Sequence, residues 1–171
     1  MASYLQIAAI AVGVIVVAPF LLPSSKTVER SALVKASPEA VFATLSSTAG
    51  YQTINPYKDL DAKLKVTPFG PEAGVGSGFA FESKDGKGTS TISAVEPNKS
   101  VTYQIDLGFM GKPVQVITLT PENGGTRVSW AVTSKFGFNP MGRVFGLFMD
   151  GMLGPHYELG LKNMDRIATP A

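Results

Sequence analysis

The sequence has no cysteine and a single histidine, His156, among its 171 residues. The absence of cysteine excludes disulfides and thiolate chemistry, and any mechanism that uses an imidazole as an acid or base has to use His156. One histidine without thiolates leaves only oxygen ligands for a metal ion, and no D-x-D-x-D-G loop occurs. We therefore predict no metal site and no cofactor.

An excess of charge of one sign is also lacking. The chain has 15 basic and 13 acidic residues, which give a formal net charge of +2. Because these charges form no basic stripe, we predict no nucleic-acid partner. Two common catalytic loops are missing as well. The glycine-rich stretch Gly70–Gly78 does not end in the Lys-Ser or Lys-Thr of a phosphate-binding loop, and it does not read G-x-S-x-G.

A long uncharged run near the N-terminus is the first feature that is present. Tyr4–Leu22 holds 19 residues without a charge, which give roughly 28 Å of helix, close to the ~30 Å hydrocarbon core of a bilayer. A cleaved signal peptide is one alternative, but no Lys or Arg precedes the run and no clear A-x-A cleavage site lies between the run and Lys26. A buried core helix would normally show a polar face. We therefore predict an uncleaved transmembrane helix over residues 4–22.

This predicted anchor divides the chain into two parts. Residues 1–25 are the anchor with a short linker, and residues 26–171 have the usual size of one domain. Every Lys and Arg lies after the apolar run. The positive-inside tendency therefore predicts a single-pass membrane protein whose soluble domain lies in the cytoplasm, with a periplasmic or other extracytoplasmic domain as the alternative.

The soluble part begins with a strand and a helix. Val28–Lys35 is rich in β-branched and small residues, which favours a strand. The sequence then places Ser37 as an N-cap and Pro38 at the first helical position, a pattern typical of a helix start. We expect this helix to end near Gly50 and to be followed by an irregular segment over residues 51–61.

A series of alternating runs follows, separated by turn residues such as Asp85-Gly86 and Asn123-Gly124. The six predicted strands are Lys63–Thr67, Gly78–Ser83, Thr89–Val95, Val101–Phe109, Val114–Thr120 and Arg127–Ser134. Apolar and polar residues alternate along them, for example at Val128, Trp130 and Val132. Alternation with a period of two indicates an antiparallel sheet with one buried side.

The period changes to a helical one after Asn139-Pro140. Apolar residues then recur at spacings of three and four: Met141, Phe145, Phe148, Met152, Tyr157, Leu161, Met164 and Ala168. Gly154-Pro155 interrupts this pattern and is expected to kink the helix. One long amphipathic helix against one curved antiparallel sheet is an α+β arrangement, which leaves an apolar space whose mouth is a natural ligand site.

Three segments carry a resemblance to a known family: SPEAVFATL at residues 37–45, INPY at residues 54–57 and MLGPHYELGLKNMDRI at residues 152–167. Together with the element order, they resemble the START/Bet v 1-like superfamily, and most closely the bacterial SRPBCC, or polyketide cyclase/dehydrase-like, proteins. The resemblance covers roughly Val28 to Ile167. Ile54 stands where members often have a tryptophan. What the resemblance implies is a helix-grip fold with a hydrophobic cavity, and no particular reaction.

Aromatic and methionine side chains on the predicted inward faces, with the single histidine, are the candidate ligand-binding residues. They are Tyr57, Phe79, Phe81, Tyr103, Trp130, Phe145, Phe148, Met152 and His156. They could simply pack a solid core. In the functional interpretation they line a cavity, where tyrosine hydroxyls and the indole N–H bind polar groups of a ligand. His156 follows the Gly-Pro step and is the one candidate catalytic residue.

Asp150 lies on or beside the apolar stripe of the C-terminal helix. An unpaired buried carboxylate is costly, so Asp150 is expected to have a basic partner. Arg143 is the nearest basic residue in sequence and is the predicted partner, although a spacing of seven is too long for direct contact within one helix.

Three hypotheses of function remain after the sequence is read. The first is a membrane-anchored module that binds a hydrophobic small molecule or lipid between the sheet and the C-terminal helix. The second is a cyclase, dehydrase or hydrolase that uses His156 with Tyr57 or Tyr103. The third is an interaction module without a ligand, which predicts a filled core and a large exposed apolar patch.

Overall fold

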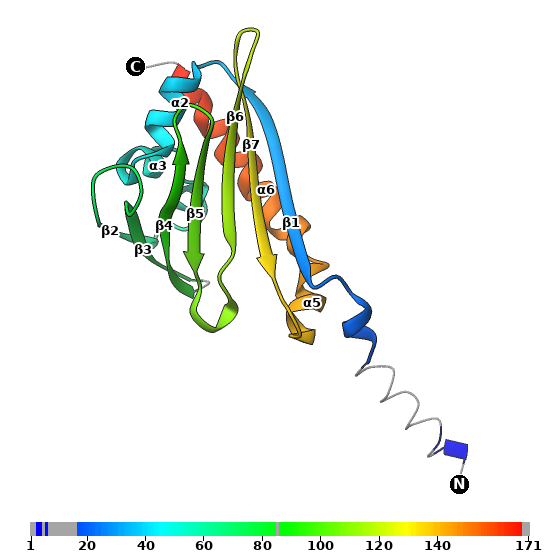
Figure 1. Ribbon diagram of the computed structural model, residues 1–171. Helices are drawn as coiled ribbons and strands as arrows, with labels where there is room; N and C mark the ends of the chain where they lie inside the picture. Colours follow the sequence, from blue (N-terminus) through cyan, green and yellow to red (C-terminus); the bar gives the residue numbers. More distant parts are fainter. Residues whose placement is uncertain (1–2, 5, 7–16, 85, 169–171) are drawn as a thin grey trace.

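A seven-stranded antiparallel sheet forms the centre of the computed structural model, which describes residues 3, 4, 6, 17–84 and 86–168 (Figure 1). The strands lie in the order β1-β7-β6-β5-β4-β3-β2, so β1 and β2 are the two edges. Their bounds are β1 Ser25–Val34, β2 Lys65–Phe69, β3 Gly78–Ser83, β4 Gly86–Glu96, β5 Ser100–Asp106, β6 Val114–Glu122 and β7 Gly125–Lys135.

Helices cover one face of this sheet. The C-terminal helix α6 contacts β1 most extensively, and α2 contacts β5, β6 and β7 (Figure 1). Residues 17–21 are helical before β1. The helical elements after β1 are α2 Pro38–Leu45, α3 Thr48–Ile54, α4 Pro56–Leu60, the short η1 Gly108–Met110, α5 Pro140–Gly146 and α6 Met149–Ala168. The predicted α+β class is therefore confirmed, and the sheet with its C-terminal helix fits the helix-grip arrangement.

The core lies between the sheet and the helices, as the alternation predicts. In β7, Val128, Trp130 and Val132 are buried on the inward face, and their neighbours on β1 and β6 continue that face. All six predicted strands exist, and none of their ends moves by more than three residues. One of the larger differences is at the end of β5. There the chain leaves the sheet at Asp106, and Phe109, the last residue of the predicted strand, is 98% exposed in η1.

The helix after β1 begins where the sequence predicts but ends early. Ser37 caps α2 by accepting a hydrogen bond from the Ala40 N–H at 3.3 Å. The chain then restarts as α3, because Ser47 accepts a hydrogen bond from the Gly50 N–H at 3.0 Å and so caps a second helix. A side chain at Gly50 would lie 2.3 Å from the Thr44 carbonyl oxygen, so the two helices meet at a glycine.

The segment expected to be irregular, residues 51–61, is instead mostly helical. Tyr51 and Ile54 belong to α3 and are buried. Asn55 then caps α4 by accepting a hydrogen bond from the Tyr57 N–H at 3.0 Å, and Pro56 occupies the first helical position. The Asn-Pro pair that suggests a turn therefore starts a helix.

The predicted C-terminal helix is two helices, and this changes which side chains face the core. In α5 the contact face is made by Gly142 and Gly146, where an added Cβ would lie 2.9 Å and 2.8 Å from the Phe136 ring. The larger apolar residues of α5 therefore point away from the sheet. The break after α5 also resets the helical phase, and α6 continues through Pro155 to Ala168. The buried large apolar residues of α6 are Met149, Tyr157, Leu161 and Met164.

The structure corrects the prediction of a transmembrane helix. Much of the expected span, residue 5 and residues 7–16, lies outside the described residues. Across the described parts of the chain, no helix combines the length and the apolar character needed to cross a bilayer. The longest of them, α6, carries exposed charged residues such as Glu158 and Lys162. This finding overturns the predicted single-pass membrane location.

Candidate functional site

Five aromatic rings meet in the space between the sheet and the helices. They come from α3 (Tyr51), β3 (Phe79), β5 (Tyr103), β7 (Trp130) and α6 (Tyr157), and each is at most 6% exposed. Tyr51 is the centre, with ring centroids 5.6 Å from Phe79, 5.2 Å from Tyr103 and 6.0 Å from Trp130. Trp130 and Tyr157 stack at 5.4 Å. We call these five residues the aromatic cluster.

The hydroxyls of the aromatic cluster are neutral at ordinary pH. Burial raises the pKa of Tyr51, Tyr103 and Tyr157 above the usual phenol value, because a phenolate would lose its hydration there. The Tyr103 hydroxyl donates a hydrogen bond to the Leu45 carbonyl oxygen, which ties β5 to the end of α2. The cluster can therefore offer neutral hydroxyls and apolar ring faces to a bound molecule.

Trp130 of the aromatic cluster and Gln115 of β6 each have a buried donor without an acceptor. Among the described residues, neither Trp130 Nε1 nor Gln115 Nε2 makes a hydrogen bond, and both atoms are buried. Gln115 lies beside Tyr51 and lowers its pKa, although burial has the larger, opposite effect. The amide nitrogen of Gln115 nevertheless donates no hydrogen bond of normal geometry. Buried donors of this kind are rare in native proteins.

His156 and Tyr57 lie beside the aromatic cluster and contact each other. Their ring centroids are 5.2 Å apart, with an edge-to-face angle of 77°. His156 is half-buried, and Tyr57 is 37% exposed although its partly desolvated hydroxyl has a pKa raised to about 12. A negative charge on the Tyr57 hydroxyl would raise the pKa of Tyr51 and of Tyr157. The Tyr57 hydroxyl therefore lies at the border of the cluster. Of the two tyrosines proposed to work with His156, the structure brings Tyr57 to it.

The other predicted ligand-binding residues divide into two groups. Phe79, Tyr103 and Trp130 lie in the aromatic cluster, and half-buried Phe81 has its ring centroid 6.3 Å from that of Phe79. The second group points outward: Phe145 is 48% exposed, Phe148 61% and Met152 50%. The expected inward orientation of these three is wrong, because α5 packs through its glycines and α6 begins a new helical phase.

These outward residues belong to a larger exposed apolar group at one end of the molecule. Its members on α5, the start of α6 and the segment before them are Phe138, Met141, Phe145, Leu147, Phe148 and Met152. The N-terminal segment leaves the sheet at the same end (Figure 1). We call this group the apolar end patch.

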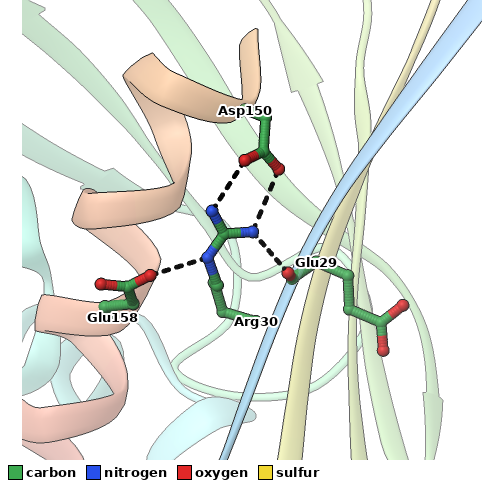
Figure 2. A network of polar contacts seen from close by, with 4 residues as sticks. All are labelled: Glu29, Arg30, Asp150 and Glu158. Atoms are coloured by element: carbon green, nitrogen blue, oxygen red, sulfur yellow. Dashed lines mark hydrogen bonds and ion pairs between the residues drawn. The ribbon is translucent and has the colours of Figure 1, made fainter.

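Arg30 joins the edge strand β1 to α6. Its guanidinium donates to both carboxylate oxygens of Asp150, at 3.1 Å and 2.9 Å, and its Nε donates to Glu158 at 2.8 Å (Figure 2). Gly154 lies between the two acids on α6, and a Cβ there would be 2.1 Å from Arg30 Nη2. We call the three charged residues the Arg30 bridge, which fixes α6 across the edge of the sheet.

The predicted partner of Asp150 is therefore wrong. Arg143 instead donates to the carbonyl oxygens of Gly137, Phe20 and Leu22, and so holds the chain that leads into β1. The partner comes from β1, which is far in sequence and close in space. Alternation does carry the signal for it, because Arg30 occupies an inward position between Val28 and Ala32.

The Arg30 bridge leads to a prediction about pH. Hydrogen bonding to Arg30 lowers the pKa of Asp150 below its usual value, so the bridge stabilises the fold above the ordinary carboxyl pKa. This stabilisation is lost as the pH falls through the lowered pKa. Arg30→Gln should therefore lower the melting temperature at pH 7, and the difference from wild type should shrink as the pH falls below 4. Thermal melts across this range measure it.

A matched control is Arg127→Gln. Arg127 also pairs with an exposed acid, Glu122, but both lie in the β6–β7 hairpin and the pair joins no separate elements. We expect a smaller loss of melting temperature from this variant at pH 7. An Arg30→Gln effect that stays constant down to pH 2 would show that the side chain acts through packing and not through charge.

Hollows on the surface lie apart from the aromatic cluster. One, of about 290 Å³, lies beside the Arg30 bridge between β1 and α6 and is lined by Ser31, Ala32, Leu33, Glu158, Leu161, Lys162 and Asp165. Another, of about 470 Å³, lies on the outer face of β5, β6 and β7. In the described chain, no three acidic or histidine side chains gather to hold a metal ion.

Solved structures with the same fold are similar to this chain at low sequence identity. The protein MLL2253 of Mesorhizobium loti is 22% identical with a TM-score of 0.56, and the match covers 82% of this chain and 98% of that one. Truncated norcoclaurine synthase of Thalictrum flavum is 13% identical with a TM-score of 0.61, over 86% of this chain and 95% of that one.

A third similar structure is the di-domain aromatase/cyclase StfQ from the steffimycin biosynthetic pathway, at 11% identity and a TM-score of 0.62, over 84% of this chain and 50% of that one. At such identities the likeness shows the fold alone. No curated protein sequence matches the chain. Residues 25–169 match the family described as polyketide cyclase / dehydrase and lipid transport. This agrees with the predicted SRPBCC resemblance, and the chain belongs to that family.

Proposed function

We propose that this protein binds a hydrophobic small molecule or lipid between the sheet and α6. The observation that carries the proposal is the pair of buried donors, Trp130 Nε1 and Gln115 Nε2, within an interior of aromatic rings. Folding leaves both donors without an acceptor among the described residues, which costs free energy that a bound acceptor would recover. The family description, which includes lipid transport, supports the same class of ligand.

Binding requires that the interior changes. The rings of the aromatic cluster touch one another across the space between α3, α6 and the sheet, so a ligand has to displace part of the cluster. Tyr51 and Tyr157 come from helices, while Tyr103 and Trp130 come from central strands. Because strands of a paired sheet are held by their neighbours on both sides, the helices are the parts that move.

The test is native mass spectrometry of the full-length protein, followed by extraction and identification of any bound molecule. We expect a hydrophobic compound of defined mass at a ratio near one per chain. A variant that fills the interior, Gly160→Val, should carry none of it, because its side chain would enter the space beside Trp130. If the wild-type protein carries nothing and takes up no hydrophobic probe, the proposal is wrong. The apolar end patch would then favour the interaction module.

A second candidate function is catalysis of the cyclase or dehydrase type. The observation that favours it is the contact of His156 with Tyr57 at the border of the aromatic cluster. Imidazole and phenol are the usual side chains for moving protons at an apolar site. The family description, which names polyketide cyclase and dehydrase, supports this type of reaction. Incubation of the protein with the compound identified by this test separates the two candidates. A catalyst returns a compound of changed mass or changed ultraviolet spectrum, whereas a carrier returns its ligand intact.

A further inference from the structure

The two buried donors share one wall of the interior. Trp130 is paired with Ile117 in the β6–β7 ladder, and Gln115 is paired with Val132. Trp130 and Gln115 are therefore diagonal neighbours on the inward face, a spacing at which long side chains reach each other. Trp130 is 0% exposed and Gln115 is 3% exposed. Both therefore serve the interior and not the solvent.

The orientation of the indole leaves its N–H on the edge away from Gly160 of α6. A Cβ on Gly160 would lie 2.6 Å from Cζ3 and 3.0 Å from Cη2 of Trp130, so the six-membered ring packs on that glycine. Nε1 is on the opposite edge of the indole. The side chain of Gln115 approaches the wall from the neighbouring strand. Because both N–H donors lack a partner among the described residues, this part of the wall can bind an acceptor atom.

No Lys, Arg or His is among the fully buried residues of the described chain. The buried polar residues of the described chain are Ser46, Thr48, Asn55, Ser77, Ser90, Gln115, Thr126 and Asn163. Arg30 is paired with Trp130 in the sheet register, but its guanidinium is already bound by Asp150 and Glu158. An ionised carboxylate or phosphate placed here would be desolvated without a counter-charge, which weakens its binding.

We propose that Trp130 and Gln115 bind the oxygen of an uncharged carbonyl group on an aromatic ligand, such as an aryl ketone, ester or amide. The donors select an acceptor, the lack of a cation selects a neutral one, and the ring faces of Tyr51 and Tyr157 favour an aromatic body. The proposal rests on the proposed function, that a hydrophobic molecule binds between the sheet and α6, and adds the polar group that the interior recognises.

Three probes with one ring system test the proposal on the full-length protein: 2-acetylnaphthalene, 2-ethylnaphthalene and 2-naphthoate. They carry a neutral carbonyl, no acceptor and an ionised carboxylate. Trp130 is the only tryptophan of the chain, so its indole N–H gives one resolved signal in a proton–nitrogen correlation spectrum. We expect 2-acetylnaphthalene to bind and to move this signal downfield. We expect 2-ethylnaphthalene to bind about 3- to 10-fold more weakly without that shift, and 2-naphthoate to bind at least about 10-fold more weakly.

Gln115→Met separates the hydrogen bond from the shape of the site. Methionine keeps the length of the side chain and removes its N–H donors, while Trp130 Nε1 can still donate. The affinity for 2-acetylnaphthalene should therefore fall toward that for 2-ethylnaphthalene, and the affinity for 2-ethylnaphthalene should not change. Gln104→Met is the matched control. Gln104 follows Tyr103 in β5 on the outer face of the sheet, and this variant should leave both affinities unchanged.

Several results would overturn the inference. The donors select nothing if the ketone and the hydrocarbon bind with equal affinity, or if the naphthoate binds more tightly than the ketone. The same conclusion follows if Gln115→Met lowers the affinity for both neutral probes by the same factor. In these cases binding itself persists and the proposed function stands. If no probe binds, the inference fails, and the proposed function is then judged by the molecule recovered from the purified protein.

Discussion

Replacing Trp130 by alanine should lower the free energy of unfolding by about 3–5 kcal/mol, the usual cost of removing a large buried aromatic side chain. Trp130 is 0% exposed, stacks on Tyr157 and lies within ring contact of Tyr51. Its removal therefore leaves the rings of Tyr51 and Tyr157 without a packing partner on one side. Urea denaturation followed by far-ultraviolet circular dichroism measures the effect, since this variant has no tryptophan fluorescence.

Trp130→Phe is the matched variant for this measurement. A phenyl ring keeps an aromatic face against Tyr157, so we expect a smaller loss of about 1–2 kcal/mol. This variant also keeps the test informative if Trp130→Ala does not fold, which is possible when total stability is only about 5–15 kcal/mol. A loss below about 1 kcal/mol for Trp130→Ala would mean that Tyr51 and Tyr157 close the space, and that the interior is adaptable without a ligand.

The second large effect is expected at the glycine that faces the same indole. Gly160→Val should cost about 3 kcal/mol, at the upper end of overpacking effects, because the Cβ alone would lie 2.6 Å from the ring. The indole has no free direction to move, since Tyr51 and Tyr157 lie against it. Equilibrium denaturation of this variant against wild type gives the number.

Gly151→Val is the control for helix propensity. Gly151 lies in the same helix with no atom within 4 Å of an added Cβ, so this variant should change stability by no more than about 0.5 kcal/mol. If both variants lose the same amount, the cost arises from valine in a helix and not from the Trp130 contact. The close packing of α6 on β7 would then have to be revised.

The sheet could be predicted from the sequence because strand alternation has only two phases. Once Val128 and Val132 are assigned inward, Trp130 between them has to face inward as well. The same rule holds Tyr103 and Phe79 in the interior. It also places Arg30 and Gln115 there, as the polar members of otherwise apolar inward rows. These two residues could have been identified by asking why a polar side chain interrupts each row.

The helical part is harder to predict from the sequence because a helix has no such fixed phase. A break of two residues after α5 changes the direction of every side chain that follows, so Phe145, Phe148 and Met152 moved from the expected interior to the surface. The glycines that bring α5 onto Phe136 give no hydrophobic signal of their own. Tyr51 was missed for a similar reason, since the cap at Ser47 that starts α3 looks like a loop residue in sequence.

The Arg30 bridge also restricts how the chain can change in length. Asp150 and Glu158 bind one guanidinium from positions eight residues apart on α6. One residue more or fewer between them would rotate one acid by about 100° around the helix axis and carry it away from β1. Gly154 adds a limit on size at the midpoint of the same segment. The segment between the two acids is therefore fixed in length, whereas α6 beyond Glu158 is free of this restriction.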